Sequence, residues 1–370
     1  FLGAFNDNVF KQGLILVLTF MAAAKLGMRV SLLNNLAAML FVLPFFLFSA
    51  LAGQIADKYE RSTLIKIIKA CEIAIIAFAI YGFHHNNIIV LLCSICLMGI
   101  HSTFFGPIKY SVLPDHLSKE ELLGANGFVE AGTFIAIFIG TIIGSYYTIS
   151  NNFIIHSLVT IAAIGFISSL TTPKSNNANR EIKVNFNIIS ESLNMIRYAQ
   201  TKKQIYLAIL GISWFWFIGA AIISQIPLLA KITFKADENV ANLFLAVFSL
   251  GVGVGSFLCS KIFEDEITVK YLFISALGIS IFGIDLFFAS RISAVAYEPA
   301  QLKSIFVFLS KRHNWRIVID LFFLAAIGGL YIVPLFAILQ HYANPAHRSR
   351  IIAVNNLINS IFMVGSTIIL

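Results

Sequence analysis

Eleven runs of about 20 mostly apolar residues dominate the sequence. A helix of that length crosses the hydrocarbon layer of a membrane. Only 12% of the residues are charged and the mean hydropathy is +0.86, whereas a soluble domain carries about 25% charged residues. We therefore predict an all-α, multi-pass membrane protein, with spans at 1–24, 32–53, 63–83, 88–112, 122–148, 152–172, 204–229, 239–260, 268–290, 316–340 and 348–370.

The polar, base-rich segment 173–203 divides these runs into two groups. It predicts a six-helix bundle over 1–172, a cytoplasmic basic linker over 173–203, and a second bundle over 204–370 of which five helices are visible. The chain begins and ends inside apolar runs, so we expect a piece of a longer protein, with a twelfth helix after the last residue.

Lysine and arginine residues predict the orientation in the membrane. They gather in the linker and the other loops on the same side as the N-terminus, which favours a cytoplasmic N-terminus. The net charge of +8 then belongs mainly to loops, and it is no argument for nucleic-acid binding. On the opposite side, the apolar stretch 302–311 predicts a short helix lying on the outer surface.

A weak internal repeat supports two equivalent halves. Asn126 and Glu130 fall on Asn355 and Asn359 at a single shift of the sequence against itself. Parallel repeats of six helices place a transport site between the halves, near the middle of the membrane.

The first apolar run contains polar and charged residues that are energetically unfavourable inside a membrane, in the segment Asn6-Asp7-Asn8-Val9-Phe10-Lys11. A carboxylate at the bilayer centre costs about 2.5–3.5 kcal/mol on insertion scales, so such a group normally faces other helices or water. Asp7 and Lys11 are four residues apart and share a helix face, where they can pair. Two interpretations stay open: a structural ion pair, or a site for a substrate or a coupling ion.

The segment Gly53-Gln-Ile-Ala-Asp57-Lys-Tyr-Glu-Arg61 follows the second run. Its spacing resembles the signature loop of the major facilitator superfamily, which implies that fold: 12 helices in two six-helix halves. The resemblance assigns conformational gating to Gly53, Asp57 and Arg61.

Further motifs are similar to the lysophospholipid transporter family, over essentially the whole chain. They are Phe5–Lys11, Gly106-Pro-Ile-Lys109 with Pro114, Ala125–Glu130, and Trp315–Asp320 with Ile332-Val-Pro334. The resemblance implies a protein of the bacterial inner membrane that delivers lysophospholipids to an acyltransferase–acyl-carrier-protein synthetase partner. In some members that partner is fused behind the transporter, and here it would lie beyond residue 370.

The resemblance also implies a site for the lipid head group. We expect Asp7, Asn8 and Lys11 to contribute, with Lys109 attracting the phosphate and Asp7 the ethanolamine ammonium. Asn126 and Glu130 share a helix face and would join them. Some members carry an arginine in helix seven; this chain has none there, and Gln225 is the remaining polar candidate.

Lys109 and Glu130 also have structural interpretations. Lys109 lies near a helix end and can reach the interface by snorkelling. Glu130 can pair with a base on a neighbouring helix. Asp285 and Asp320 lie nearer the outer ends of their helices, and we interpret them as structural. Cys93 and Cys96 have CxxC spacing but lie inside an apolar run, so we expect packed cysteines and no metal.

Three classes of function can be compared with these sequence features. The favoured one is transport of lysophosphatidylethanolamine-type lipids by alternating access. The alternative is a proton-coupled antiporter of a small solute or drug, with Asp7 or Glu130 as proton carrier. The third, an enzyme, is disfavoured because no histidine precedes an aspartate by five residues, as acyltransferases require, and the P-loop pattern is missing. No cofactor is predicted.

Overall fold

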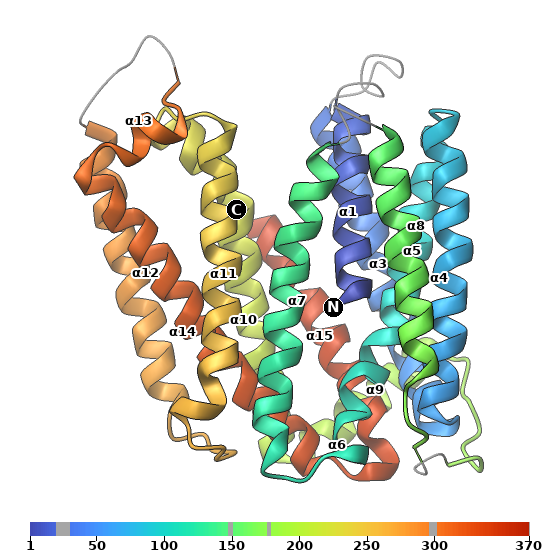
Figure 1. Ribbon diagram of the computed structural model, residues 1–370. Helices are drawn as coiled ribbons and strands as arrows, with labels where there is room; N and C mark the ends of the chain where they lie inside the picture. Colours follow the sequence, from blue (N-terminus) through green and yellow to red (C-terminus); the bar gives the residue numbers. More distant parts are fainter. Residues whose placement is uncertain (20–29, 147–150, 176–178, 296–301, 370) are drawn as a thin grey trace. The chain divides into compact units, whose positions relative to one another are not determined.

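The computed structural model describes residues 1–19, 30–146, 151–175, 179–295 and 302–369, and helices dominate them (Figure 1). In chain order these are α1 Leu2–Val17, α3 Val30–Lys58, α4 Arg61–His84, α5 Ile88–Ser111, α6 Leu113–His116, α7 Glu121–Ser145, α8 Asn151–Leu170, α9 Ile188–Gln200, α10 Lys203–Leu228, α11 Glu238–Ile262, α12 Leu272–Val295, α13 Ile305–Leu309, α14 Arg312–Tyr342 and α15 Arg348–Ile369.

Every predicted span corresponds to one of these helices, and within the described residues 8 of them are long and apolar enough to cross a membrane. The clearest difference is at the end of α3, which continues to Lys58. Gly53 and Asp57 therefore lie on the last turns of a helix, not in the loop where the sequence interpretation placed them. Glu60 then begins α4 by accepting hydrogen bonds from the amides of Ser62 and Thr63.

Three short helices, α6, α9 and α13, lie outside the predicted spans. α13 confirms the helix expected within 302–311. α9 lies in the basic linker, where the sequence analysis identified no helix; its N-cap is Asn187, which accepts from the Ser190 amide.

The chain forms two compact units. Unit 1 contains residues 1–117, 139–209 and 339–361, and unit 2 contains 118–138, 210–338 and 362–370. Unit 1 thus includes the beginning of α15, which comes from the far end of the sequence. The division into residues 1–172, 173–203 and 204–370 stays a prediction.

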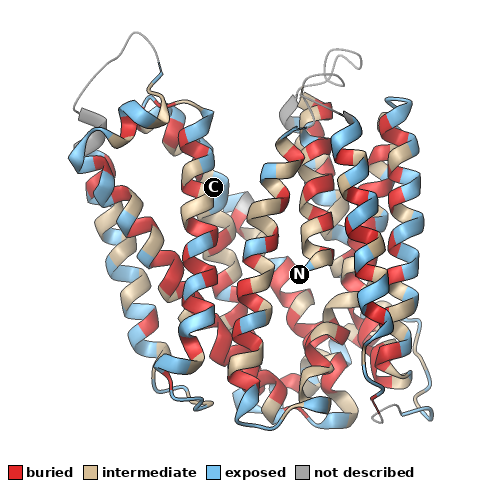
Figure 2. Cartoon of the chain, viewed as in Figure 1, coloured by how far each residue is buried: buried red, intermediate tan, exposed pale blue. Residues whose placement is uncertain are grey.

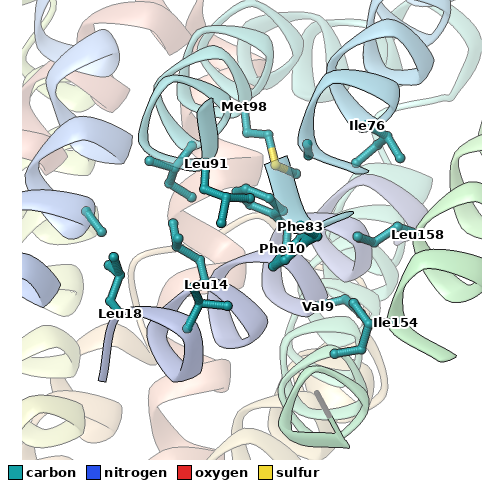
Figure 3. Packing of buried hydrophobic residues seen from close by; sticks show 14 of the residues in the cluster. Val9, Phe10, Leu14, Leu18, Ile76, Phe83, Leu91, Met98, Ile154 and Leu158 are labelled. Carbon is teal, nitrogen blue, oxygen red and sulfur yellow. The ribbon is translucent and has the colours of Figure 1, made fainter. Parts of the chain in front are cut away.

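The core of unit 1 lies where α1, α4, α5 and α8 meet (Figure 3). Phe10 of α1 and Phe83 of α4 form an edge-to-face ring pair with centroids 5.5 Å apart. Leu91 and Leu158, both fully buried, add branched side chains from α5 and α8. This packing holds the inner face of α1 in place, and the polar residues of α1 lie one turn before it.

Small residues bring helix backbones together. In unit 2, a Cβ on Gly255 of α11 would lie 1.8 Å from the Ala326 carbonyl oxygen of α14, so only glycine fits. In unit 1, a Cβ on Gly144 of α7 would lie 2.7 Å from the Val9 carbonyl oxygen.

Exposed residues occur along most of the helices (Figure 2), and many of them are large and apolar. On α12, Phe273 is 76% exposed and Ile274 is 62% exposed. Surfaces of this kind suit contact with lipid chains.

Candidate functional site

Helix α1 places two adjacent polar residues inside unit 1. Asn6 is fully buried and Asp7 is 8% exposed. The Asp7 carboxylate accepts a hydrogen bond of 2.7 Å from the Ser102 hydroxyl of α5. Asn8, half-buried, donates to the Ala4 carbonyl of its own helix at 2.7 Å. Asp7 is therefore tied to a second helix, whereas Asn8 is bonded locally.

The pairing between Asp7 and Lys11 that the sequence allows is absent among the described residues. The Lys11 ammonium lies over the Phe41 ring of α3, 4.5 Å from its centroid. A cation–π contact with a ring stabilises a charge without a carboxylate partner. The Asp7 carboxylate and the Lys11 ammonium are thus both held, but by different neighbours.

Beside Asp7 lies a buried charged cluster that the sequence analysis missed. The Asn6 amide donates to Glu72 Oε1 of α4 at 3.0 Å, and the Lys69 ammonium contacts Glu72 Oε2 at 2.5 Å. His101 Nε2 of α5 lies 3.7 Å from the same Glu72 oxygen. We call Asn6, Asp7, Lys69, Glu72, His101 and Ser102 the polar patch.

One sequence signal indicated this cluster. The sequence analysis singled out neither Lys69 nor Glu72. The two residues are three apart within α4, so they share a face of the helix, and both are buried. An opposite-charge pair at such a position is itself a sign of a buried polar site.

Within the described residues, three buried atoms of the polar patch have no hydrogen-bond partner: Asn6 Oδ1, Asp7 Oδ1 and His101 Nε2. Leaving such an atom unsatisfied costs about 1–3 kcal/mol. Two of the three are oxygens that can only accept. The polar patch therefore has unused capacity for a group that donates hydrogen bonds, such as an ammonium or water.

Lys109 lies on α5 two turns beyond Ser102, on the same face of the helix. Its ammonium lies over the ring of the adjacent Tyr110, 4.4 Å from the centroid. Lys109 is the last base of α5, two residues before the helix ends. That position is compatible with either snorkelling or substrate contact.

The other predicted site residues belong to unit 2. Asn126 and Glu130 are buried on α7, and the Asn126 amide donates to the Leu122 carbonyl at 2.8 Å. Gln225 of α10 is half-buried. Their participation in one site with Asp7, Asn8, Lys11 and Lys109 stays a prediction.

Asp57 and Arg61, the predicted gating residues, lie in a second buried cluster of unit 1. Asp57 accepts from the backbone amides of Ser349 and Arg350 at 2.9 and 3.3 Å, at the first turn of α15. A carboxylate there satisfies free amides and complements the positive end of the helix. The Arg350 side chain adds an ion pair at 3.0 Å.

Asp115 of α6 completes this arrangement. It pairs with Arg61 and, at 3.3 Å, with Arg348. The Ser349 hydroxyl donates to Ser111 at 3.0 Å. We call Asp57, Arg61, Asp115, Arg348, Ser349 and Arg350 the ion-pair cluster. Only the first two were predicted, because Asp115 and Arg348 are separated by 233 residues and no local pattern joins them.

Gly53 permits the approach of α3 to α15. A Cβ at this position would lie 2.8 Å from both the Ala353 Cβ and the Arg350 Cα. Any larger residue would push the two helices apart, so Gly53 keeps Asp57 within reach of the α15 amides.

The basic linker is attached to the same region. The Ser175 hydroxyl donates to Asp115 at 2.5 Å, and the Asn179 amide donates to the Asp57 carbonyl at 3.0 Å. The Ser175 amide bonds to Glu60 at 3.0 Å. Partial burial raises the pKa of Glu60, but hydrogen bonds from Thr63, Ser175 and Ser62 outweigh it and hold the pKa at about 2.

In unit 2, Asp285 forms an ion pair with Arg316, with a 3.0 Å bond from Nε. This agrees with the structural interpretation of Asp285. Asp320 is buried, and its Oδ2 has no partner within the described residues.

Comparisons with known proteins cover nearly the whole chain. The model of the Major Facilitator Superfamily matches residues 1–367. The lysophospholipid transporter LplT of Escherichia fergusonii is 23% identical over 96% of this chain and 82% of its own length. The protein of the same name from Salmonella typhimurium is also 23% identical, with the same coverage.

Solved structures agree on the fold. The human organic anion transporter MFSD10 has a TM-score of 0.71 at 11% identity, covering 100% of this chain and 92% of that one. The Escherichia coli fucose:proton symporter FucP has a TM-score of 0.64 at 11% identity, covering 98% and 90%. At such identities the likeness concerns the fold alone.

Proposed function

The chain belongs to the major facilitator superfamily, and we propose that it transports lysophospholipids of the lysophosphatidylethanolamine type across a bacterial inner membrane. Similarity to proteins named lysophospholipid transporter, over 96% of the chain, supports this substrate class. The family match also favours a transporter over an enzyme.

The observation that carries the proposal is that the polar patch contains buried oxygen atoms that can still accept hydrogen bonds. Asn6 Oδ1 and Asp7 Oδ1 are buried without a partner among the described residues. An ethanolamine ammonium offers three N–H donors and a positive charge for these oxygens. Lys11 or Lys109 would attract the phosphate of the same head group.

Asn126, Glu130 and Gln225 complete the proposed substrate site from unit 2. We propose them from the sequence, as polar residues of α7 and α10. Binding at a midplane between two helical halves is the usual arrangement for alternating access.

We further propose that the ion-pair cluster is the gate, with Gly53, Asp57 and Arg61 as its core. Breaking it would free the beginning of α15 from α3 and let one end of the transporter open. The surplus of bases on the linker side supports a cytoplasmic N-terminus and linker. Delivery to an acyltransferase partner also stays a proposal, and the names of the relatives do not mention one.

The decisive test is transport of labelled lysophosphatidylethanolamine into vesicles that contain the purified protein. We expect movement well above that in empty vesicles, and equal rates would overturn the proposal. Lys109→Ala should lower the rate, whereas Lys270→Ala should leave it unchanged. Lys270 is a suitable control because its ammonium also lies over an adjacent ring, that of Tyr271, 5.1 Å away, but in an exposed loop.

A second candidate, a proton-coupled antiporter, is favoured by one observation. Glu72 and His101 lie 3.7 Å apart inside the polar patch, and a carboxylate beside an imidazole can hold a transferable proton. Asp7 and Glu130 are the carriers proposed from the sequence. Collapse of the proton gradient by an ionophore should stop an antiporter, whereas uncoupled lipid movement would continue.

A further inference from the structure

Helix α9 has one face fixed to unit 1 and one face open. On the fixed side, Glu191 and Ala199 are buried, and the Tyr198 ring lies 5.0 Å from the ring of His347. The segment before the helix is held as well, because Asn185 exchanges two hydrogen bonds with Gln54 of α3, at 2.7 and 3.2 Å. These contacts therefore prevent α9 from rotating about its own axis.

The open face carries an apolar stripe that ends in a base. Ile189 is 74% exposed and Leu193 is 48% exposed, and the exposed Arg197 follows them at the same four-residue spacing. Phe186, just before the helix, is 77% exposed. Because the anchoring fixes the other side, these apolar groups have no alternative buried position.

Charge on this segment is strongly one-sided. The exposed bases between residues 180 and 203 are Arg180, Lys183, Arg197, Lys202 and Lys203. The acids in the same stretch are Glu181, which is exposed, and Glu191, which is buried against unit 1. An amphipathic helix with apolar residues and clustered bases matches a surface that offers both acyl chains and negative charge.

The short connection between α9 and α10 fixes how far α9 can lie from the membrane surface. Lys203 begins α10, which is apolar and long enough to span the membrane, and only Thr201 and Lys202 separate the two helices. Two connecting residues extend over roughly 10 Å at most. The basic end of α9 is therefore close to the layer where the lipid head groups lie.

We propose that α9 is a binding site for anionic diacyl phospholipids of the bilayer surface, with phosphatidylglycerol as the probe. Ile189, Leu193 and Phe186 enter the boundary between head groups and acyl chains. Arg197, Lys202 and Lys203 bind the phosphates. This site is separate from the polar patch and does not depend on which substrate the protein transports.

The first experiment measures lipid binding to the purified full chain by native mass spectrometry, with phosphatidylglycerol against phosphatidylcholine. The variant Arg197→Gln/Lys202→Gln/Lys203→Gln should weaken phosphatidylglycerol binding by roughly fivefold per base, and on the order of a hundredfold in total. The matched control, Lys119→Gln/Lys261→Gln/Lys270→Gln, removes the same charge from exposed positions of unit 2. We expect the control to bind as the parent does.

Two results would overturn the proposal. Equal losses in both variants would mean that net charge, and not α9, attracts the lipid. No loss in the α9 variant would mean that the lipid binds elsewhere. Lysophospholipid transport measured on the same samples separates this question from the proposed function, because either property can fail while the other persists.

A second experiment measures how deeply the apolar stripe of α9 lies in the lipid bilayer. A nitroxide label at Leu193→Cys, with the four native cysteines changed to alanine, is compared with one at Lys174→Cys in phosphatidylglycerol vesicles. We expect oxygen to relax the Leu193 label and a water-soluble nickel chelate to relax the Lys174 label. A water-exposed Leu193 label would overturn the proposal, and so would one shielded from both reagents, which would indicate a protein covering the stripe.

Discussion

The two charged clusters of unit 1 differ in how fully their carboxylates are used. In the ion-pair cluster, both oxygens of Asp57 and both oxygens of Asp115 contact arginine side chains or amide and hydroxyl donors. In the polar patch, Asp7 uses one oxygen for Ser102 and leaves the other without a partner among the described residues. The carboxylates of the first cluster are fully used, although the Nε atoms of Arg61 and Arg348 have no partner among the described residues. The Asp7 carboxylate of the second cluster still has an oxygen that can accept a hydrogen bond from a ligand.

This difference separates structural from transport effects. Removing a partner from a saturated buried ion pair leaves an uncompensated charge and destabilises the fold. Removing an acceptor that is kept for a ligand should affect transport more than stability. The following variants test that separation, from the largest expected effect to the smallest.

Asp115→Ala should have the largest effect. It leaves Arg61 and Arg348 without the carboxylate that both contact, which costs about 3–5 kcal/mol in comparable buried pairs. We expect a clear fall in the thermal unfolding midpoint in detergent, together with loss of transport. Asp265→Ala, at an exposed loop position, is the control. A stable Asp115→Ala protein would show that the cluster does not hold α15.

Lys69→Met and Glu72→Gln test the internal pair of the polar patch. Each single change strands the other charge, so each should destabilise by about 3 kcal/mol. In the double variant both charges are gone, and much of the stability should return. Unfolding midpoints of the four proteins form a double-mutant cycle. Purely additive losses would contradict a direct coupling between Lys69 and Glu72.

Asp7→Asn should reduce transport with little change in stability. The amide oxygen can still accept from Ser102, but the negative charge for the substrate ammonium is lost. A hydrogen bond to a charged group contributes about 1.5–3 kcal/mol, which corresponds to roughly 10- to 100-fold in rate. Initial transport rates at low lipid concentration measure it. Asn8→Ser, beside it, should have a smaller effect, since Asn8 is bonded to its own helix.

The smallest effect concerns acid stability. The folded-state pKa of Glu60 is about 2, below its ordinary 4.5, so its contribution is complete above about pH 4.5 and disappears as the pH falls through 2. Glu60→Gln should therefore lower stability at neutral pH and flatten its decline between pH 4.5 and 2. Unfolding midpoints across that range measure the slope; an unchanged slope would contradict the pKa.

The sequence predicted the helices well because membrane thickness imposes their length. It located Asp57 and Arg61 because their spacing is local. It did not find Asp115 or Arg348 as their partners, since tertiary folding brings these residues together from distant parts of the chain. Helix spacing allowed a pair between Lys11 and Asp7. In the folded protein, Lys11 instead contacts the Phe41 ring and Asp7 accepts a hydrogen bond from the Ser102 hydroxyl. Lys69 and Glu72 were missed because the sequence analysis did not consider an opposite-charge pair at three-residue spacing inside an apolar run.

The attachment of the linker has a consequence for observing the protein in action. Three linker amides, those of Ser175, Asn179 and Asn185, bond to Glu60, Asp57 and Gln54 respectively. Each acceptor lies at the end of α3 or the start of α4, next to the ion-pair cluster. Separation of α15 from α3 would disturb these acceptors, and the three amides would then exchange their hydrogens with water more quickly. Hydrogen–deuterium exchange in the linker would thus report, from outside the membrane, how often the ion-pair cluster opens.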